Sequence, residues 1–458
     1  MPSVVLNRVE RGRYLDSVAA MRASRRLAAL PGIEGAALMI GSPSNKGLLR
    51  DAGLLAADGE AAGTNDLVIA VRASNETAGR RALDSALNLA SERSETFPHA
   101  RTLADALAAL PRANLALISV PGDFAALEAR KALTAGLNVL VFSSGVPLEE
   151  ERALKDLAKE KGLLLMGPDC GTALIGGTPI AFANVVPRGD IGIVSASGTG
   201  LQEVSCLIAR MGGGVSHGIG VGGRDLDERV GALGTLAAID ALEADPGTKT
   251  IVLISKPPAP HVAEQVLSRL KQSGKRSVAC FLGLDQPGLA RTLREVAEMA
   301  TGGKIEQQPI ARPSNPSRRL VHAYYCGGTL CSEAELIFRR LGLSGHRFVD
   351  LGDDRYTRGR PHPMIDPELR NDHIVRADAD PEVGVILVDV VLGYGSHADP
   401  AGVLLKNPVA KTLVASVTGT EQDPQVRSRQ VAQLREAGVL VASSNAHAAE
   451  LAASLVSY

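Results

Sequence analysis

The stretch Asp190–Gly212, DIGIVSASGTGLQEVSCLIARMG, changes from the pattern of a strand to the pattern of a helix within a few residues. An apolar run leads into S-A-S-G-T-G, and beyond it the apolar residues recur with helical spacing. The first turn of a helix has unpaired N–H groups and the positive end of the helix dipole, and glycine lets the backbone approach a ligand closely. The stretch therefore predicts a strand–loop–helix unit of an α/β fold whose loop can hold an anion.

The composition supports an α/β fold and excludes some classes of partner. Hydrophobic residues make up 45% of the 458 residues, but aromatic residues only 3%, and tryptophan is absent. Cores must therefore be built from Ala, Leu, Val and Ile, which favours parallel sheets covered by helices. The net charge of −1 argues against nucleic acid or an anionic membrane as the main partner. We expect a small-molecule substrate.

The cysteines show no pattern of a metal site or a disulfide framework. None of them forms a C-x-x-C motif or pairs with histidine at metal-ligand spacing, so we predict no metal. They are Cys170, Cys206, Cys280, Cys326 and Cys331. The N-terminus, MPSVVLNRVERGRYLD, lacks the apolar core of a signal peptide, and no apolar run reaches membrane-spanning length. We expect a cytoplasmic protein.

Short apolar runs alternate with amphipathic segments along most of the chain, which predicts parallel sheets wound with helices. The proline-rich stretch KIEQQPIARPSNPSRR has no apolar period and is predicted to be a linker. We predict an N-terminal α/β unit, a second α/β domain, a flavodoxin-like domain, the linker and another flavodoxin-like domain, at residues 1–95, 96–186, 187–303, 304–319 and 320–458.

The two flavodoxin-like segments resemble each other in three places. IGIVSASGTGLQEV matches LVHAYYCGGTLCSEAEL, which aligns Gly198 with Gly328 and Thr199 with Thr329. ADPGTKTIVLIS matches ADPEVGVILVDV, and KRSVACFLG matches KTLVASVTG, in the same order and at nearly equal spacing. The repeat predicts two half-sites that face one ligand. The alternative is a duplicated fold whose glycines serve packing alone.

Several of these motifs resemble a known enzyme family. SVPGDF, AGLNVLVFSSGVP and MGPDCG resemble the CoA-binding domain of the succinyl-CoA synthetase α subunit, and IGIVSASGTG and GIGVGGRD resemble the ligase domain that follows it. CGGTLC, FVDLGDD and LVDVVLGYGSHADPAG resemble the carboxy-terminal domain of the β subunit. This order, together with GRPHPMIDPELR, is similar to that of the FdrA-type proteins over nearly the whole chain.

The resemblance implies a fold and a function. Residues 96–186 would form a Rossmann-like domain of CoA-binding type, and the two flavodoxin-like domains would be of succinyl-CoA synthetase ligase type. FdrA-type proteins are associated with oxamate carbamoyltransferase, which makes oxalurate and phosphate from carbamoyl phosphate and oxamate in purine breakdown. The chain would then act with other subunits, as an oligomer, on carbamoyl phosphate or phosphate. The implied phosphate-binding residues are Ser195, Ser197, Gly198, Thr199, Cys326, Gly327, Gly328 and Thr329.

The sequence also departs from succinyl-CoA synthetase. VACFLGLDQPGLART stands where that family has its phosphorylated histidine and contains none, so we expect no phosphohistidine. AALMIGSPSNKGLL replaces the glycine-rich loop of the CoA-binding domain, so CoA binding stays open, and no ATP-grasp segment is present. Two alternatives remain: a subunit of a succinyl-CoA synthetase-like, NDP-forming acyl-CoA synthetase, and a non-catalytic scaffold that binds a metabolite.

Three residues outside the repeat are candidates for a catalytic role. Arg224 in GVGGRDLD follows glycines and could bind a phosphate or carboxylate, or else pair with a neighbouring aspartate. His362 in GRPHPMID and His397 in GYGSHADP lie where a ligand could reach them, or else are loop residues without a role. An acidic group that begins at Asp350 could hold a cation, but a solvated turn is the simpler interpretation.

Overall fold

The computed structural model describes residues 3–13, 15, 17–90, 100–307, 319–357 and 361–456. They divide into two compact units, each of which is described by itself. The first unit contains Met1–Leu163 and Asp354–Pro361, and the second contains Leu164–Asp353 and His362–Tyr458. Residues 308–318, most of the predicted linker, lie outside the described residues.

The first unit begins with a three-stranded sheet in the order β1-β3-β2. Both outer strands pair antiparallel with β3. The prediction of a parallel sheet for this part of the chain is therefore wrong. Alternation of strands and helices does not reveal that the last strand inserts between the first two. One face of the sheet packs on α1 and α4, and the other on the segment that contains α2 and α3. The bounds are β1 Val4–Glu10, α1 Ser17–Ala28, β2 Ile33–Ile40, α2 Pro43–Asp51, α3 Ala57–Glu60, β3 Leu67–Ala73 and α4 Glu76–Ala90.

The rest of the first unit alternates strands and helices. Strands β4 and β5 pair in parallel over four residues each, as expected for a Rossmann-like domain. Helix α6 begins against the loop that follows β5, because a Cβ at Gly122 would lie 2.4 Å from the carbonyl oxygen of Ser144. The bounds are α5 Leu103–Ala109, β4 Leu115–Ile118, α6 Gly122–Thr134, β5 Asn138–Val141, α7 Leu148–Glu160 and α13 Asp354–Thr357.

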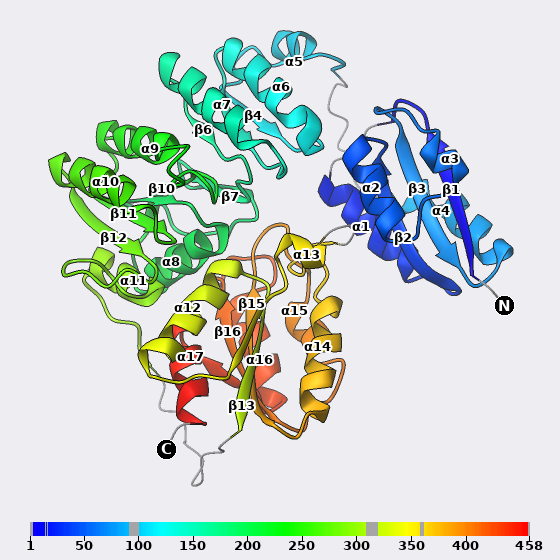
Figure 1. Cartoon of the computed structure of the whole chain (residues 1–458). Coiled ribbons are helices and arrows are strands. Elements are labelled where there is room, and N and C mark those ends of the chain that lie inside the picture. Colours follow the sequence, from blue (N-terminus) through cyan, green and yellow to red (C-terminus); the bar gives the residue numbers. More distant parts are fainter. Residues whose placement is uncertain are drawn as a thin grey trace. The chain divides into compact units, whose positions relative to one another are not determined.

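The second unit contains two larger sheets (Figure 1). The first has the order β12-β11-β9-β10-β7-β8, and the second has the order β14-β13-β15-β16-β17. The elements up to the linker are β6 Leu165–Met166, β7 Thr172–Ile175, β8 Thr178–Ala181, β9 Ile191–Ser195, α8 Gly198–Arg210, β10 Val215–Gly220, α9 Leu233–Ala244, β11 Thr250–Ser255, α10 Pro260–Gln272, β12 Arg276–Phe281 and α11 Leu293–Thr301. Those after it are β13 Leu320–Tyr325, α12 Gly328–Arg340, β14 Arg347–Asp350, α14 Glu368–Ala379, β15 Val383–Val391, α15 Pro400–Leu404, β16 Thr412–Thr418, α16 Arg427–Glu436, β17 Leu440–Ala442 and α17 Asn445–Ser454.

The two sheets repeat the same strand order. Strands β10-β9-β11-β12 correspond to β14-β13-β15-β16, and every neighbouring pair within these sets is parallel. With β17 added, the second sheet has the flavodoxin order 2-1-3-4-5. The predicted fold class and the predicted duplication are confirmed, and α8 and α12 are the equivalent first helices of the two copies.

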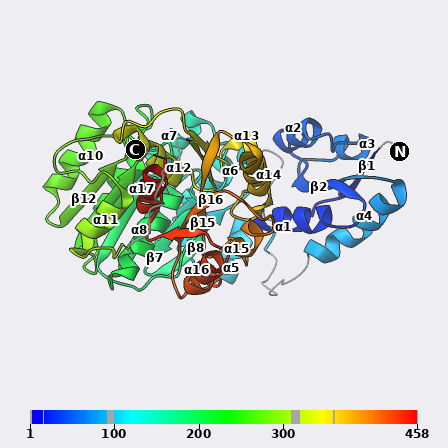
Figure 2. The same ribbon diagram turned by 90° about the horizontal axis from the view of Figure 1, so that it is seen from below.

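Four helices, α8, α11, α12 and α17, pack together where the two copies meet (Figures 1 and 2). Glu203 on α8 accepts a hydrogen bond of 3.0 Å from the first amide of α17, at Asn445. Glu333 on α12 accepts one of 2.6 Å from the first amide of α11, at Leu293. Both glutamates are buried, and each completes the unpaired helix end of the other copy. The contact is therefore reciprocal and fixes α8 and α12 relative to one another.

All five cysteines lie in the described part of the chain, where each is buried and has a free thiol. None of its helices combines the length and the apolar character that a membrane crossing needs.

Glu333 is expected to make the stability of the protein depend on pH. Burial raises the pKa of its carboxyl group to about 7, whereas the ordinary pKa of an exposed Glu is 4.5. Between about pH 4.5 and 7 the folded state keeps a proton that the unfolded state releases, so stability falls as the pH rises. We expect Glu333→Gln to reduce the loss of thermal stability between pH 5 and pH 8. Glu335→Gln, exposed on the same helix, is the control, and an unchanged pH dependence in Glu333→Gln would contradict this role.

Candidate functional site

The start of α8 has the features of an anion site. Ser197 is extended and its side chain accepts a hydrogen bond of 2.9 Å from the amide of Gly200, so it caps the helix. The hydroxyl of Ser195 holds the loop, since it accepts from the amide of Ser197 and donates to its carbonyl oxygen. A Cβ at Gly198 would lie 2.9 Å from Oγ1 of Thr172, which explains the glycine. The first turn contains no acidic residue that would offset the positive end of the helix dipole.

The start of α12 is already occupied by a carboxylate of the protein. Asp389 accepts the amide of Cys326 on Oδ1 at 2.7 Å and the amide of Gly327 on Oδ2 at 2.9 Å. Its side chain is fully buried and forms an ion pair of 3.2 Å with Arg370, which is also buried. Burial raises the pKa of Asp389, and Arg370 opposes this effect. The two copies therefore differ in charge at the same position of the fold.

The two helix starts touch. The hydroxyl of Ser197 donates to Oγ1 of Thr329 at 2.5 Å, and a Cβ at Gly327 would lie 2.9 Å from Cγ2 of Thr199. The structure thus brings the predicted phosphate-binding residues together at one junction, although phosphate binding itself stays a prediction. They are Ser195, Ser197, Gly198, Thr199, Cys326, Gly327, Gly328 and Thr329.

Asp350 lies at this junction, although the sequence placed it in a solvated turn. A Cβ at Gly328 would be 2.4 Å from its Oδ2, while its Oδ1 accepts the amide of Gly352 at 2.9 Å. Burial raises the pKa of Asp350 to about 6, and the charge of Lys256 counteracts part of the rise. Sequence reasoning missed Lys256, which directly follows strand β11. Lys256 follows the carboxyl end of a parallel strand, where ligands bind in α/β folds, and this position could have identified it as a candidate.

His362 and His397 are both hydrogen-bonded to the backbone of Met364. The amide of Met364 donates to Nδ1 of His362 at 3.2 Å, and its carbonyl oxygen accepts the amide of His397 at 2.8 Å. Burial lowers the pKa of His362 to about 4, so the imidazole is neutral at physiological pH. A Cβ at Gly352 would lie 2.7 Å from its Nε2 and 3.2 Å from Oδ1 of Asp350. His362 is therefore a neighbour of the helix junction.

Arg224 is exposed in the loop that follows β10. Its neighbour Asp225 is buried and accepts the amides of Gly234 and Thr235, so that carboxylate caps α9. The catalytic roles of Arg224, His362 and His397 stay predictions.

The thiols of Cys326 and Cys331 are unsuited to nucleophilic chemistry. Burial raises the pKa of both thiols, which disfavours the reactive thiolate. Both side chains are buried, as expected of cysteines that serve packing.

Removal of Asp389 should destabilise the second unit strongly. Asp389→Ala would leave the guanidinium of Arg370 buried without its carboxylate partner, which costs about 3–5 kcal/mol. We expect this decrease in the free energy of unfolding, measured with urea. The exposed Asp353→Ala should change it by less than about 0.5 kcal/mol. A loss below about 1 kcal/mol for Asp389→Ala would contradict the buried ion pair.

Two domain profiles match this chain. A CoA-ligase domain matches residues 324–455, and the heavy metal-associated domain of AllF matches residues 3–102. The second match raises the question whether residues 3–102 contain ligands for a heavy metal.

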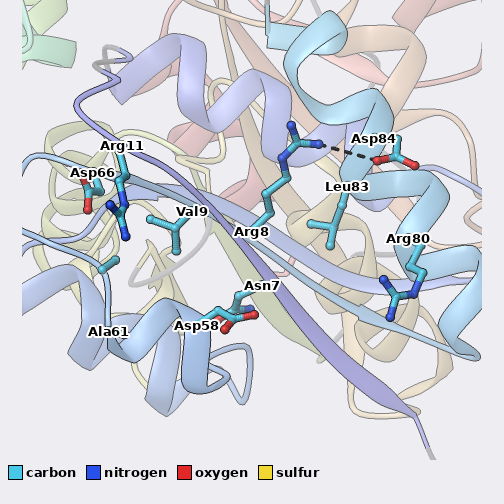
Figure 3. Close-up of a pocket in the computed structure, with 11 residues that line it drawn as sticks. Asn7, Arg8, Val9, Arg11, Asp58, Ala61, Asp66, Arg80, Leu83 and Asp84 are labelled. Atoms are coloured by element: carbon cyan, nitrogen blue, oxygen red, sulfur yellow. Dashed lines mark ion pairs between the residues drawn. The ribbon is translucent and has the colours of Figure 1, made fainter.

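The N-terminal domain does not fit a heavy metal. Thiolates and imidazoles are the ligands that such metals prefer, yet residues 3–102 contain no cysteine and only His99, which lies outside the described residues. Among the described residues no group of three or more potential metal ligands occurs. Figure 3 shows arginine and aspartate side chains around a hollow of about 900 Å³ in this domain, with Arg8 paired to Asp84 at 3.6 Å.

Relatives and solved structures differ in how much of the chain they match. Two succinate–CoA ligase α subunits are 31% identical over 151 residues (Archaeoglobus fulgidus) and 30% identical over 201 residues (Aquifex aeolicus). These matches cover 31% and 42% of this chain but only 50% and 63% of those subunits. An acetyl-coenzyme A synthetase of Ca. Korarchaeum cryptofilum matches with 17% identity and a TM-score of 0.31, over 75% of this chain and 82% of that one. Such a low score carries no conclusion.

One relative matches over almost its whole length. The uncharacterized protein YahF of Escherichia coli K12 is 42% identical over 494 residues, which cover 96% of each chain. This match, the CoA-ligase domain and the ligase relatives agree with the duplicated ligase-type fold. The chain belongs to the YahF family, within the superfamily of succinyl-CoA synthetases and NDP-forming acyl-CoA synthetases.

Proposed function

We propose that this chain is a subunit of an enzyme that transfers an acyl group from an acyl phosphate, with the phosphate bound at the start of α8. One observation carries the proposal: no acidic residue lies in the first turn of α8, whereas the carboxylate of Asp389 accepts the two amides that directly precede α12, at Cys326 and Gly327. A site of this kind suits a phosphate group, because unpaired amides and the helix dipole both favour negative charge.

The reaction needs no nucleophile from the protein. The acceptor attacks the acyl carbon, the bond from that carbon to the bridging oxygen breaks, and phosphate leaves with the electron pair. Amides at the start of α8 would stabilise the charge that develops on the departing phosphate. This accounts for a ligase-type fold without histidine in the segment VACFLGLDQPGLART.

CoA is the acceptor that the family supports best. The matching domain is a CoA-ligase domain, and several relatives are CoA ligase subunits by name, including a malate–CoA ligase subunit of Methylorubrum extorquens. The chain would then form an acyl-CoA and phosphate from an acyl phosphate. A partner subunit would supply any nucleotide chemistry, since the sequence contains no ATP-grasp segment.

Carbamoyl transfer to oxamate is the second candidate. Two observations favour it: the N-terminal match to a domain of AllF, and the absence of the histidine on which the phosphoryl relay of succinyl-CoA synthetase depends. The resemblance to FdrA-type proteins points the same way. The phosphate would occupy the same position in both candidates, and only the acceptor would differ.

An assay with two donor and acceptor pairs separates these candidates. The purified chain, alone and with the products of neighbouring genes, is given acetyl phosphate with CoA, or carbamoyl phosphate with oxamate. We expect acetyl-CoA to form in the presence of partners. Oxalurate formation without acetyl-CoA would establish the second candidate instead, and no product with either pair would contradict acyl transfer.

Two substitutions of Ser197 test the phosphate site. Aspartate and asparagine both cap helices well, so α8 should remain folded in Ser197→Asp and in Ser197→Asn. The extra negative charge of aspartate should weaken the binding of inorganic phosphate at least about tenfold, whereas asparagine should change it less than about threefold. Calorimetric titration measures both. Equal affinities in the two variants would exclude phosphate from the start of α8.

A further inference from the structure

One carboxylate oxygen of Asp350 accepts a hydrogen bond from the protein, and the other does not. Its Oδ1 accepts the amide of Gly352 at 2.9 Å. Its Oδ2 forms no hydrogen bond or ion pair with any described residue, although it lies beside Gly328 at the start of α12. Gly327, the preceding residue, contacts Thr199 on α8, so the open oxygen belongs to the junction of the two helix starts.

The proposed reaction requires a proton acceptor at this junction. A thiol or an amide that attacks the acyl carbon must lose its proton, and helix amides can only donate. Asp389 is unsuitable, because its two oxygens already accept two amides and the guanidinium of Arg370. His362 is also unsuitable, because its Nδ1 accepts the amide of Met364 and its remaining proton therefore sits on Nε2. Among the described carboxylates and imidazoles considered at the junction, Asp350 keeps an oxygen without a hydrogen bond.

We propose that Asp350 is the catalytic base of the acyl transfer and takes the proton of the acceptor on Oδ2. This inference rests on the proposed function. As the nucleophile bonds to the acyl carbon, its proton passes to Asp350, and the phosphate departs with the electrons of the broken carbon–oxygen bond. The proton is then released to solvent.

The surroundings of Asp350 suit this role. The carboxylates of Asp389 and Asp353 raise the pKa of Asp350 and the ammonium of Lys256 lowers it, but burial has the largest effect, so the pKa is about 6. The other titratable groups beside it are the neutral imidazole of His362 and the buried thiols Cys326 and Cys331. A base with a pKa somewhat below neutral is ionised at physiological pH and still accepts a proton effectively.

Sulfate binding tests the position of Asp350 without requiring turnover. Sulfate remains a dianion between pH 5 and pH 8, so any pH dependence of its affinity reports on the protein. In the wild-type chain, affinity should fall as the pH rises through about 6, because an ionised Asp350 repels the anion. Asp350→Asn should remove this dependence and bind sulfate at least about fivefold tighter at pH 8.

The possible outcomes distinguish the two proposals. Absence of sulfate binding to the wild-type chain would contradict the anion site itself. Binding that is equally strong in wild type and Asp350→Asn at pH 8 would leave the anion site intact but overturn the placement of Asp350 beside it. Thermal unfolding of the variant shows that it is folded, and Asp350→Ser serves as the second neutral variant.

Turnover of acetyl phosphate and CoA by the complete enzyme tests the chemical role. Asp350→Asn should lower kcat by about 10²–10⁴-fold without raising KM for acetyl phosphate, because loss of the negative charge favours binding of the donor. Asp353→Asn should keep kcat and shift the acid limb of the pH profile to lower pH, because the charge of Asp353 raises the pKa of Asp350. An unchanged kcat in Asp350→Asn would refute the proposal.

Discussion

The reciprocal contact of Glu203 and Glu333 fixes the positions of helices α8 and α12, on which the candidate site of the second unit depends. Each glutamate lies on the first helix of its own copy and binds the first amide of the last helix of the other copy. Asn445 strengthens the contact, since its side chain also donates to Glu333 at 2.7 Å. Because both side chains are buried and hydrogen-bonded, α8 and α12 cannot move apart without leaving buried polar groups unpaired. The helix starts consequently meet at Ser197 and Thr329.

The contact between the two helix starts brings two partial positive charges close together. Each start carries the positive end of a helix dipole, and two such ends repel each other at contact distance. The buried carboxylate of Asp389 and the partly buried one of Asp350 offset the positive end of α12, while the first turn of α8 has no acidic residue. Duplication has therefore produced two equivalent positions with different charge. This difference is the basis for assigning the phosphate to α8 and the proton transfer to the side of α12.

Much of the fold could be predicted because it repeats within the sequence. The correspondence of SASGTG with CGGT identified the two helix starts, and the repeated strand order followed from it. The antiparallel sheet of the N-terminal domain could not be predicted, since the order of strands in a sheet depends on packing rather than on local pattern. The role of Asp389 was also hidden, because it reaches the amides of Cys326 and Gly327 from more than sixty residues away. Asp350 resembled a residue of a solvated turn until the structure placed it beside Gly328.

We infer that the duplicated fold has one open anion site, at α8, and that Asp389 fills the equivalent site at α12 with a carboxylate of the protein. Isothermal titration calorimetry on the full-length protein measures how many inorganic phosphate ions bind per chain. We expect one phosphate per chain. Two equivalent phosphates per chain, or none, would show that this inference is wrong.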